Sequence, residues 1–93
     1  MADEREIYLM PRVTASAFPD LLELMAGEDD FPRTFAEWTA LWERRRFEEE
    51  RDHGYQVVFV DVVPAGFAIF CRNMNFPPNW GALGQFITAK AGR

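Results

Sequence analysis

The chain has 93 residues, of which 48% are hydrophobic, 15% aromatic and 27% charged, and its formal net charge is −5. This composition is that of a folded chain and excludes a disordered one, and the acidic balance argues against a surface built for phosphate backbones or anionic lipid. We therefore expect a single domain over residues 1–93 whose ends, residues 1–5 and 91–93, fray. We do not expect nucleic acid or a membrane as its partner.

The cysteine content and the first residues bear on the compartment. Cys71 is the only cysteine, which excludes an intrachain disulfide and favours a reducing compartment. The first six residues are largely charged and precede no long apolar run, so we expect neither a signal peptide nor a membrane span. The sequence therefore predicts a cytoplasmic protein.

The first part of the chain is expected to form a strand and a helix. Residues 7–10 are a short apolar run that Pro11 closes, as is typical of a strand at a sheet edge. Ser16 is placed to cap the following helix and Gly27 to end it. Four apolar residues between them have the spacing of one helical face: Phe18, Leu21, Leu22 and Met25.

A second, longer helix is predicted up to His53. Thr34 and Glu37 have the spacing of a capping box at its start, and Gly54 is placed to end it. The large apolar residues of its first half make one stripe: Phe35, Trp38, Leu41 and Trp42.

The second half of this helix is charged nearly all round. The aromatic stripe continues into Arg45 and Glu49. The arginines of residues 44–46 and the glutamates of residues 48–50 lie at the i, i+4 spacing of weak ion pairs. We expect this half to project into solvent or against another chain.

The second part of the chain repeats the order of a strand and two helices. Residues 55–63 are the clearest strand, and their β-branched side chains on both faces indicate a strand covered on both sides. Pro64 suits the first position of a helix and Asn79 the N-cap of the last one, in which Gly81 and Gly84 leave room for close packing. The helices have these apolar faces: Phe67, Phe70, Cys71 and Met74, then Trp80, Leu83, Phe86 and Ile87.

The predicted fold is therefore α+β and rich in helix, in the order β-α-α-β-α-α, with four helices packed on a small sheet of two short strands. A pair of strands is marginal by itself. A homodimer that joins the sheets of two copies across a two-fold axis would complete the sheet, and we expect the protein to form one.

The residues with reactive side chains do not form a recognisable site. Asp52 and His53 are an acid and a base, but neighbours on a helix point in different directions, and the helix dipole already explains a histidine in the last turn. Cys71 lies on an apolar helical face, which indicates a buried structural thiol. One histidine and one cysteine cannot make an ordinary zinc site, and no glycine pattern for binding phosphate is present. The sequence therefore predicts a protein that is not an enzyme, with no catalytic, metal or cofactor site.

The large and charged side chains suggest an interaction surface instead. Trp38, Trp42 and Trp80 are either core residues or the walls of an aromatic groove. Arg45 and Glu49 extend the same helical stripe and complete the candidate surface. The acidic residues 28–30 are expected to form a solvated turn rather than a docking site.

These features favour a small non-enzymatic protein-interaction module that binds itself, as a homodimer, or another protein. One alternative is an acidic inhibitor that mimics nucleic acid, because the loop at residues 28–30 and the long helix carry many carboxylates. The arginines among those carboxylates weaken the mimicry.

Another alternative comes from the order of elements in residues 55–91, one strand followed directly by two helices. In this order and in its lengths the segment resembles ribbon-helix-helix transcription regulators, in which paired strands of a dimer read the major groove. The resemblance implies a DNA-binding regulator or an antitoxin. The strand itself offers only Gln56 on one face and Asp61 on the other as polar side chains toward the bases.

Overall fold

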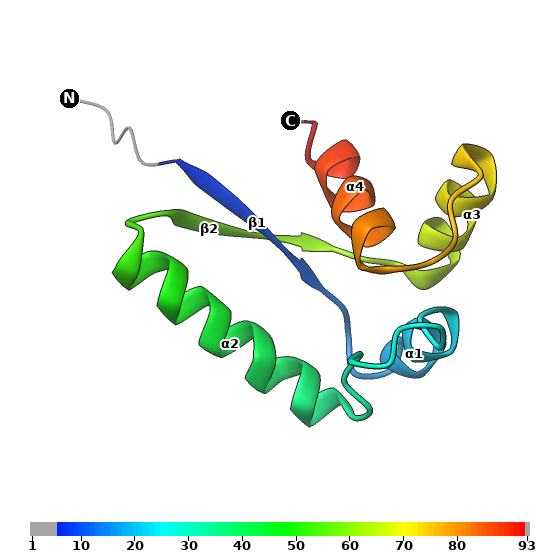
Figure 1. Ribbon diagram of the computed structural model, residues 1–93, viewed down its shortest axis with the longest axis horizontal. Helices are drawn as coiled ribbons and strands as arrows, with labels where there is room; N and C mark the ends of the chain where they lie inside the picture. The colour runs from blue at the N-terminus through cyan, green and yellow to red at the C-terminus, as the bar shows by residue number, and fades with distance from the viewer. Residues whose placement is uncertain (1–5, 93) are drawn as a thin grey trace.

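The computed structural model describes residues 6–92 and has the six expected elements in the expected order (Figure 1). They are β1 (Ile7–Arg12), α1 (Phe18–Leu24), α2 (Phe35–Asp52), β2 (Gln56–Asp61), α3 (Pro64–Met74) and α4 (Trp80–Ala91). The α+β class and the β-α-α-β-α-α order are thus confirmed. The fraying expected for residues 1–5 and Arg93 lies outside the described residues, whereas Ala91 ends α4 and Gly92 caps it with φ at 72°.

The two strands form one parallel sheet in which Ile7 lies opposite Gln56 and Arg12 opposite Asp61. At one end the Gln56 N–H donates to the Glu6 carbonyl (2.8 Å), and at the other end the N–H of residue 62 donates to the Arg12 carbonyl (2.7 Å). Along a strand, successive residues point their main-chain N–H and C=O groups to opposite sides, so every second residue of a parallel pair bonds to the neighbouring strand. Even-numbered residues of both strands therefore point their main-chain groups at the neighbouring strand, and odd-numbered residues point theirs outward.

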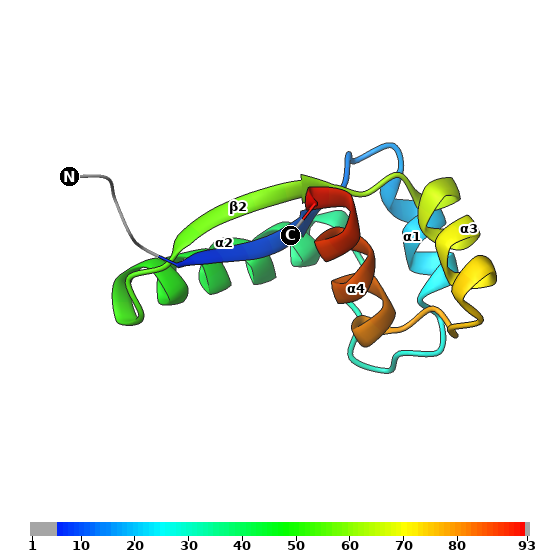
Figure 2. The same cartoon turned by 90° about the horizontal axis from the view of Figure 1, so that it is seen from above.

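The helices are distributed unevenly around this sheet. α2 lies along one face and α4 packs on the other, while α1 and α3 pack against each other beyond the carboxyl ends of the strands (Figure 1). Figure 2 shows that α4 crosses only the carboxyl-terminal ends of the strands, so that the amino-terminal part of this face of the sheet carries no helix. The expectation that residues 55–63 are covered on both sides therefore holds only near the carboxyl end of β2.

The core lies where the carboxyl ends of the strands meet the helices. Phe67 of α3 is fully buried there, and the Cys71 side chain, one turn later, is buried as predicted. The remaining buried members lie in α1, α2, β2 and α4 and in the segments that connect the elements: Val13, Phe18, Leu21, Met25, Phe31, Trp38, Val60, Val62, Ala82, Leu83 and Ile87.

The first strand and helix differ from the prediction in their bounds. β1 continues through Pro11 to Arg12, because residue 11 is odd-numbered and its missing N–H would have pointed away from β2. Ser16 does not cap α1; the Thr14 hydroxyl accepts from the Ala17 N–H instead (3.2 Å). The helix also ends before Gly27, with Met25 at its C-cap.

The other helix ends follow the sequence closely. Thr34 and Glu37 form the complete capping box, and the Asn79 side chain accepts from the main chain of α4 at its start. Pro64 occupies the first turn of α3. The expected packing role of Gly84 is wrong, because a side-chain carbon added there would meet no atom within 4 Å.

Candidate functional site

The aromatic stripe of α2 is the starting point of the candidate site. The capping box at Thr34 fixes where α2 begins, and the stripe then recurs at helical spacing on the side that faces the sheet. Trp38 is 3% exposed and belongs to the core, with its ring centroid 5.9 Å from that of Phe18 and 5.6 Å from that of Trp42. Trp42, one turn later, is only partly buried.

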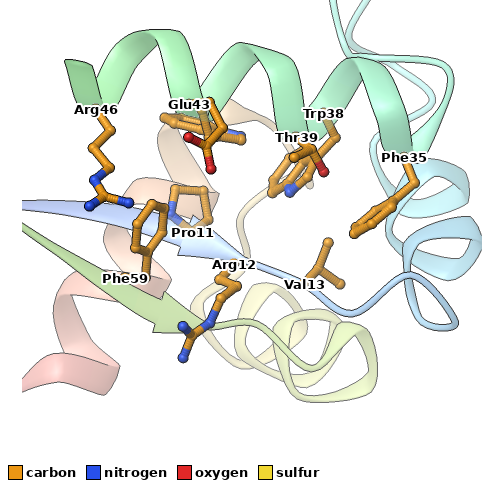
Figure 3. Close-up of a pocket in the computed structure, with 10 residues that line it drawn as sticks. Pro11, Arg12, Val13, Phe35, Trp38, Thr39, Glu43, Arg46 and Phe59 are labelled. Carbon is orange, nitrogen blue, oxygen red and sulfur yellow. The ribbon is translucent and has the colours of Figure 1, made fainter. Parts of the chain in front are cut away.

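A hollow of about 400 Å³ lies between α2 and the sheet; we call it the sheet-side hollow. Figure 3 shows side chains of α2 directed toward the strands, with Pro11 and Phe59 of the strands facing them. The lining residues are Pro11, Arg12, Val13, Phe35, Trp38, Thr39, Trp42, Glu43, Arg46 and Phe59. Four of the ten lining residues are aromatic and two more are apolar, and charged groups of both signs lie among them.

A second hollow, of about 340 Å³, lies on the other side of Trp42; we call it the Trp80-side hollow. Its lining consists of Asp30, Leu41, Trp42, Arg45 and Trp80. The rings of Trp42 and Trp80 are nearly perpendicular, at 67°, with centroids 6.2 Å apart. Arg45 lies 5.8 Å from the centroid of the Trp42 ring, within the range of a cation–π contact.

Trp42 therefore forms a wall shared by both hollows, and its polar atom is unusual. The indole Nε1 of Trp42 is buried and has no hydrogen-bond acceptor among the described residues. Leaving a buried donor unpaired costs about 1–3 kcal/mol. The residue that carries this cost is therefore one that lines both hollows.

Two arginine side chains that line the sheet-side hollow lie over the ring of Phe59. The guanidinium groups of Arg12 and Arg46 each lie 6.0 Å from the centroid of the Phe59 ring. Arg12 also donates to Asp61 at 2.8 Å, and this hydrogen bond and charge lower the pKa of the Asp61 carboxyl below its usual range. Arg46 is paired more loosely with Glu50 of its own helix, at 3.6 Å.

The acidic loop before α2 also contributes to the site, although a solvated turn was expected. Asp30 accepts the indole N–H of Trp80 (2.8 Å), and Glu28 accepts the main-chain N–H of the same residue (2.9 Å). The helix dipole makes the start of α4 a favourable place for these carboxylates. The loop is therefore docked on α4 and holds the Trp80 ring in place.

The structure separates the five residues proposed from sequence into three groups. Trp42, Arg45 and Trp80 line the Trp80-side hollow together, and Trp38 lines the sheet-side hollow. Glu49 lines neither hollow; its carbonyl accepts from the main chain of the turn that follows α2.

Sequence reasoning did not find several lining residues. Arg12 and Phe59 come from the two strands, and their meeting with α2 depends on the strand register, which no local pattern reveals. Asp30 was visible as a charge, but nothing local indicated its contact with a ring fifty positions later. Phe35 was recognised as part of the α2 stripe and turned out to line the sheet-side hollow.

The reactive side chains lie apart from both hollows. Burial raises the pKa of the Cys71 thiol, which keeps it protonated and unreactive. His53 packs against Tyr55 at the far end of α2, with ring centroids 5.7 Å apart. Within residues 6–92, no three side chains of the metal-binding types gather into a candidate metal site. No helix in this part of the chain is both long enough and apolar enough to cross a bilayer.

Comparisons with known protein families, with curated proteins and with solved structures found no significant match to this chain.

Proposed function

We propose that the protein is a non-enzymatic interaction module that binds a segment of another polypeptide against α2, with side chains of that segment in the two hollows beside Trp42. The observation that carries the proposal is the shared wall: Trp42 separates two adjacent aromatic hollows of about 400 and 340 Å³. Sites of this size with apolar walls and a few polar groups are typical of ligand binding.

The chemistry of the linings favours a polypeptide over a small charged molecule. Each hollow has charges of both signs, with Arg12, Arg46 and Glu43 in one and Arg45 and Asp30 in the other. A polypeptide supplies apolar side chains, charges of either sign and main-chain carbonyls. Such a carbonyl is a hydrogen-bond acceptor of the kind that the indole N–H of Trp42 lacks. The N–H reaches the carbonyl if the indole shifts when the polypeptide binds.

Selection from a random peptide library displayed on phage tests the proposal. Enriched peptides are titrated into the protein, with intrinsic tryptophan emission and peptide anisotropy as readouts. Three consecutive arginines of α2 provide matched variants, because Arg45 lines one hollow, Arg46 lines the other and Arg44 lines neither. We expect Arg45→Ala or Arg46→Ala to weaken binding by about fivefold to tenfold and Arg44→Ala to change it by less than about twofold.

Two results would overturn the proposal. One is the absence of any enriched peptide that changes tryptophan emission on binding. The other is an equal loss of affinity for all three arginine variants, which would indicate general charge attraction and not recognition in the hollows.

A further inference from the structure

The outer edge of β1 is open. Ile7 and Leu9 are odd-numbered, so their main-chain N–H and C=O groups point away from β2. Within residues 6–92, no other group hydrogen-bonds to these outward groups. The outer edge of β2 is partly used, because the Lys90 ammonium donates to the outward carbonyl of Asp61. An open edge of this kind is a template for pairing with another strand.

The charges along β1 are arranged symmetrically about Leu9. Glu6 lies three residues before Leu9 and Arg12 three residues after it. If two β1 strands pair antiparallel with their Leu9 residues opposite each other, Glu6 of each copy lies opposite Arg12 of the other. Opposite charges in directly facing positions stabilise such a pair.

The residues between these charges also match. In the same register Ile7 of one copy lies opposite Pro11 of the other, and Tyr8 lies opposite Met10, so every facing pair between the charges is apolar or aromatic. Leu9 takes a hydrogen-bonded position, which its outward main-chain groups require. Pro11 accepts the N–H of the facing Ile7 through its carbonyl but has no N–H to donate, so each Ile7–Pro11 pair makes one hydrogen bond and not two.

The edge of β2 lacks this self-complementarity. A pair of β2 strands centred on Phe59 would place Asp61 opposite Val57 and would bring no opposite charges together. It would also compete with Lys90 for the Asp61 carbonyl. Between the two open edges of the sheet, the charge pattern selects β1.

We propose that two copies of this chain associate through β1, paired antiparallel about Leu9, so that the two-stranded sheets of both copies become one continuous sheet. The assembly stops at two copies, because each copy has one β1 edge and the dimer buries both. The outer edges of the four-stranded sheet are then the two β2 strands. The interface does not depend on peptide binding, although Arg12 also lines the sheet-side hollow and the second copy would border it.

Molar mass measured by light scattering or sedimentation equilibrium over a wide concentration range is the first test. We expect the mass to rise from 10.8 kDa toward twice that value. Glu6→Arg makes two like-charge pairs across the axis and should weaken the dimer about tenfold. The triple variant Glu6→Arg, Arg12→Glu, Asp61→Arg reverses every charge, keeps both the pair within the chain and the pair between chains, and should restore dimerisation.

A cysteine placed at the axis tests the register. In the proposed pairing the Cα atoms of the two Leu9 residues lie about 5.5 Å apart, within disulfide range. Leu9→Cys should therefore form a covalent dimer under mild oxidation, since Cys71 is buried. Val58, opposite Leu9 in the sheet, would lie about 14 Å from its counterpart, so Val58→Cys should not crosslink.

Each of three results would overturn the inference: a monomer at every concentration, a charge-reversed triple variant no better than Glu6→Arg, or Val58→Cys crosslinking as fast as Leu9→Cys. Circular dichroism of each variant shows whether a lost dimer reflects lost folding. The peptide titration relies on Arg45 and Arg46, which lie outside β1. Failure of the dimer proposal is therefore distinguishable from failure of the peptide-binding proposal.

Discussion

The indole N–H of Trp80 donates to the Asp30 carboxylate at 2.8 Å, although the two residues are fifty positions apart. Glu28 accepts from the main-chain N–H of Trp80 at 2.9 Å, so the loop holds the first residue of α4 by two hydrogen bonds. Because α4 packs on the sheet and Trp80 forms a wall of the Trp80-side hollow, these bonds connect the acidic loop to both the fold and the candidate site.

Removing the Glu28 carboxylate should destabilise the protein. It accepts a main-chain N–H at the start of a helix, where caps of this kind contribute about 1–2 kcal/mol. We expect Glu28→Ala to lower the free energy of unfolding in urea by about that amount, and Glu28→Gln, which keeps an acceptor, by less. Asp29 makes no hydrogen bond to the described residues, so Asp29→Ala should change the free energy of unfolding by less than about 0.5 kcal/mol. An equal effect at Glu28 and Asp29 would argue against the cap.

Gly84 offers a stabilising substitution. It lies inside α4, and a methyl group there would meet no atom within 4 Å. Alanine in a helix interior is favoured over glycine by about 0.5–1 kcal/mol, so Gly84→Ala should raise the free energy of unfolding by that amount. Gly92, with φ at 72°, is the control, because Gly92→Ala should destabilise the same helix. Destabilisation by Gly84→Ala would show that this face of α4 is packed against something.

The sequence indicated the helix ends better than the long-range contacts. Thr34, Pro64 and Asn79 act through neighbours a few residues away, and each was predicted in its role. Pro11 was misjudged because its effect depends on whether its nitrogen faces the other strand, which is a property of the register. The pairing of Arg12 with Asp61 depends on the same register and was beyond local reasoning.

The candidate surface shows the same division. Helical spacing placed Trp38, Trp42 and Arg45 on neighbouring positions of one helix, but it could not show that Trp38 is core and that Trp42 separates two hollows. That difference depends on contacts far apart in sequence: Phe18 of α1 and Phe31 of the preceding loop pack on the Trp38 ring, whereas Trp80 of α4 packs on the Trp42 ring. Glu49 continued the stripe in sequence, yet no second element brings it to either hollow.

Cys71 should react slowly in the folded protein. Burial raises the pKa of its thiol and also restricts access to it, and the thiolate is the reactive species. We expect modification by Ellman's reagent to be slow in buffer and to accelerate with urea in step with unfolding followed by tryptophan emission. A rate in buffer equal to that in urea would show that the helix α3 opens readily around this position.

The Arg12–Asp61 pair should make stability depend on acid pH. Arg12 lowers the pKa of Asp61 in the folded protein below the unfolded value of about 3.9. The folded state then holds its proton less tightly than the unfolded state, so the pair stabilises the protein above the unfolded pKa and this contribution is lost as the pH falls through the folded value. Asp61→Asn should lower the melting temperature slightly at pH 7, and this difference should shrink on acidification. The difference should be small and should also shrink in high salt, since both side chains are mostly exposed (60% and 67%).

In an Arg12→Gln background the Asp61→Asn change should have little further effect on the melting temperature. A difference in melting temperature that persists unchanged at pH 2.5 would mean that Asp61 acts through something other than its charge.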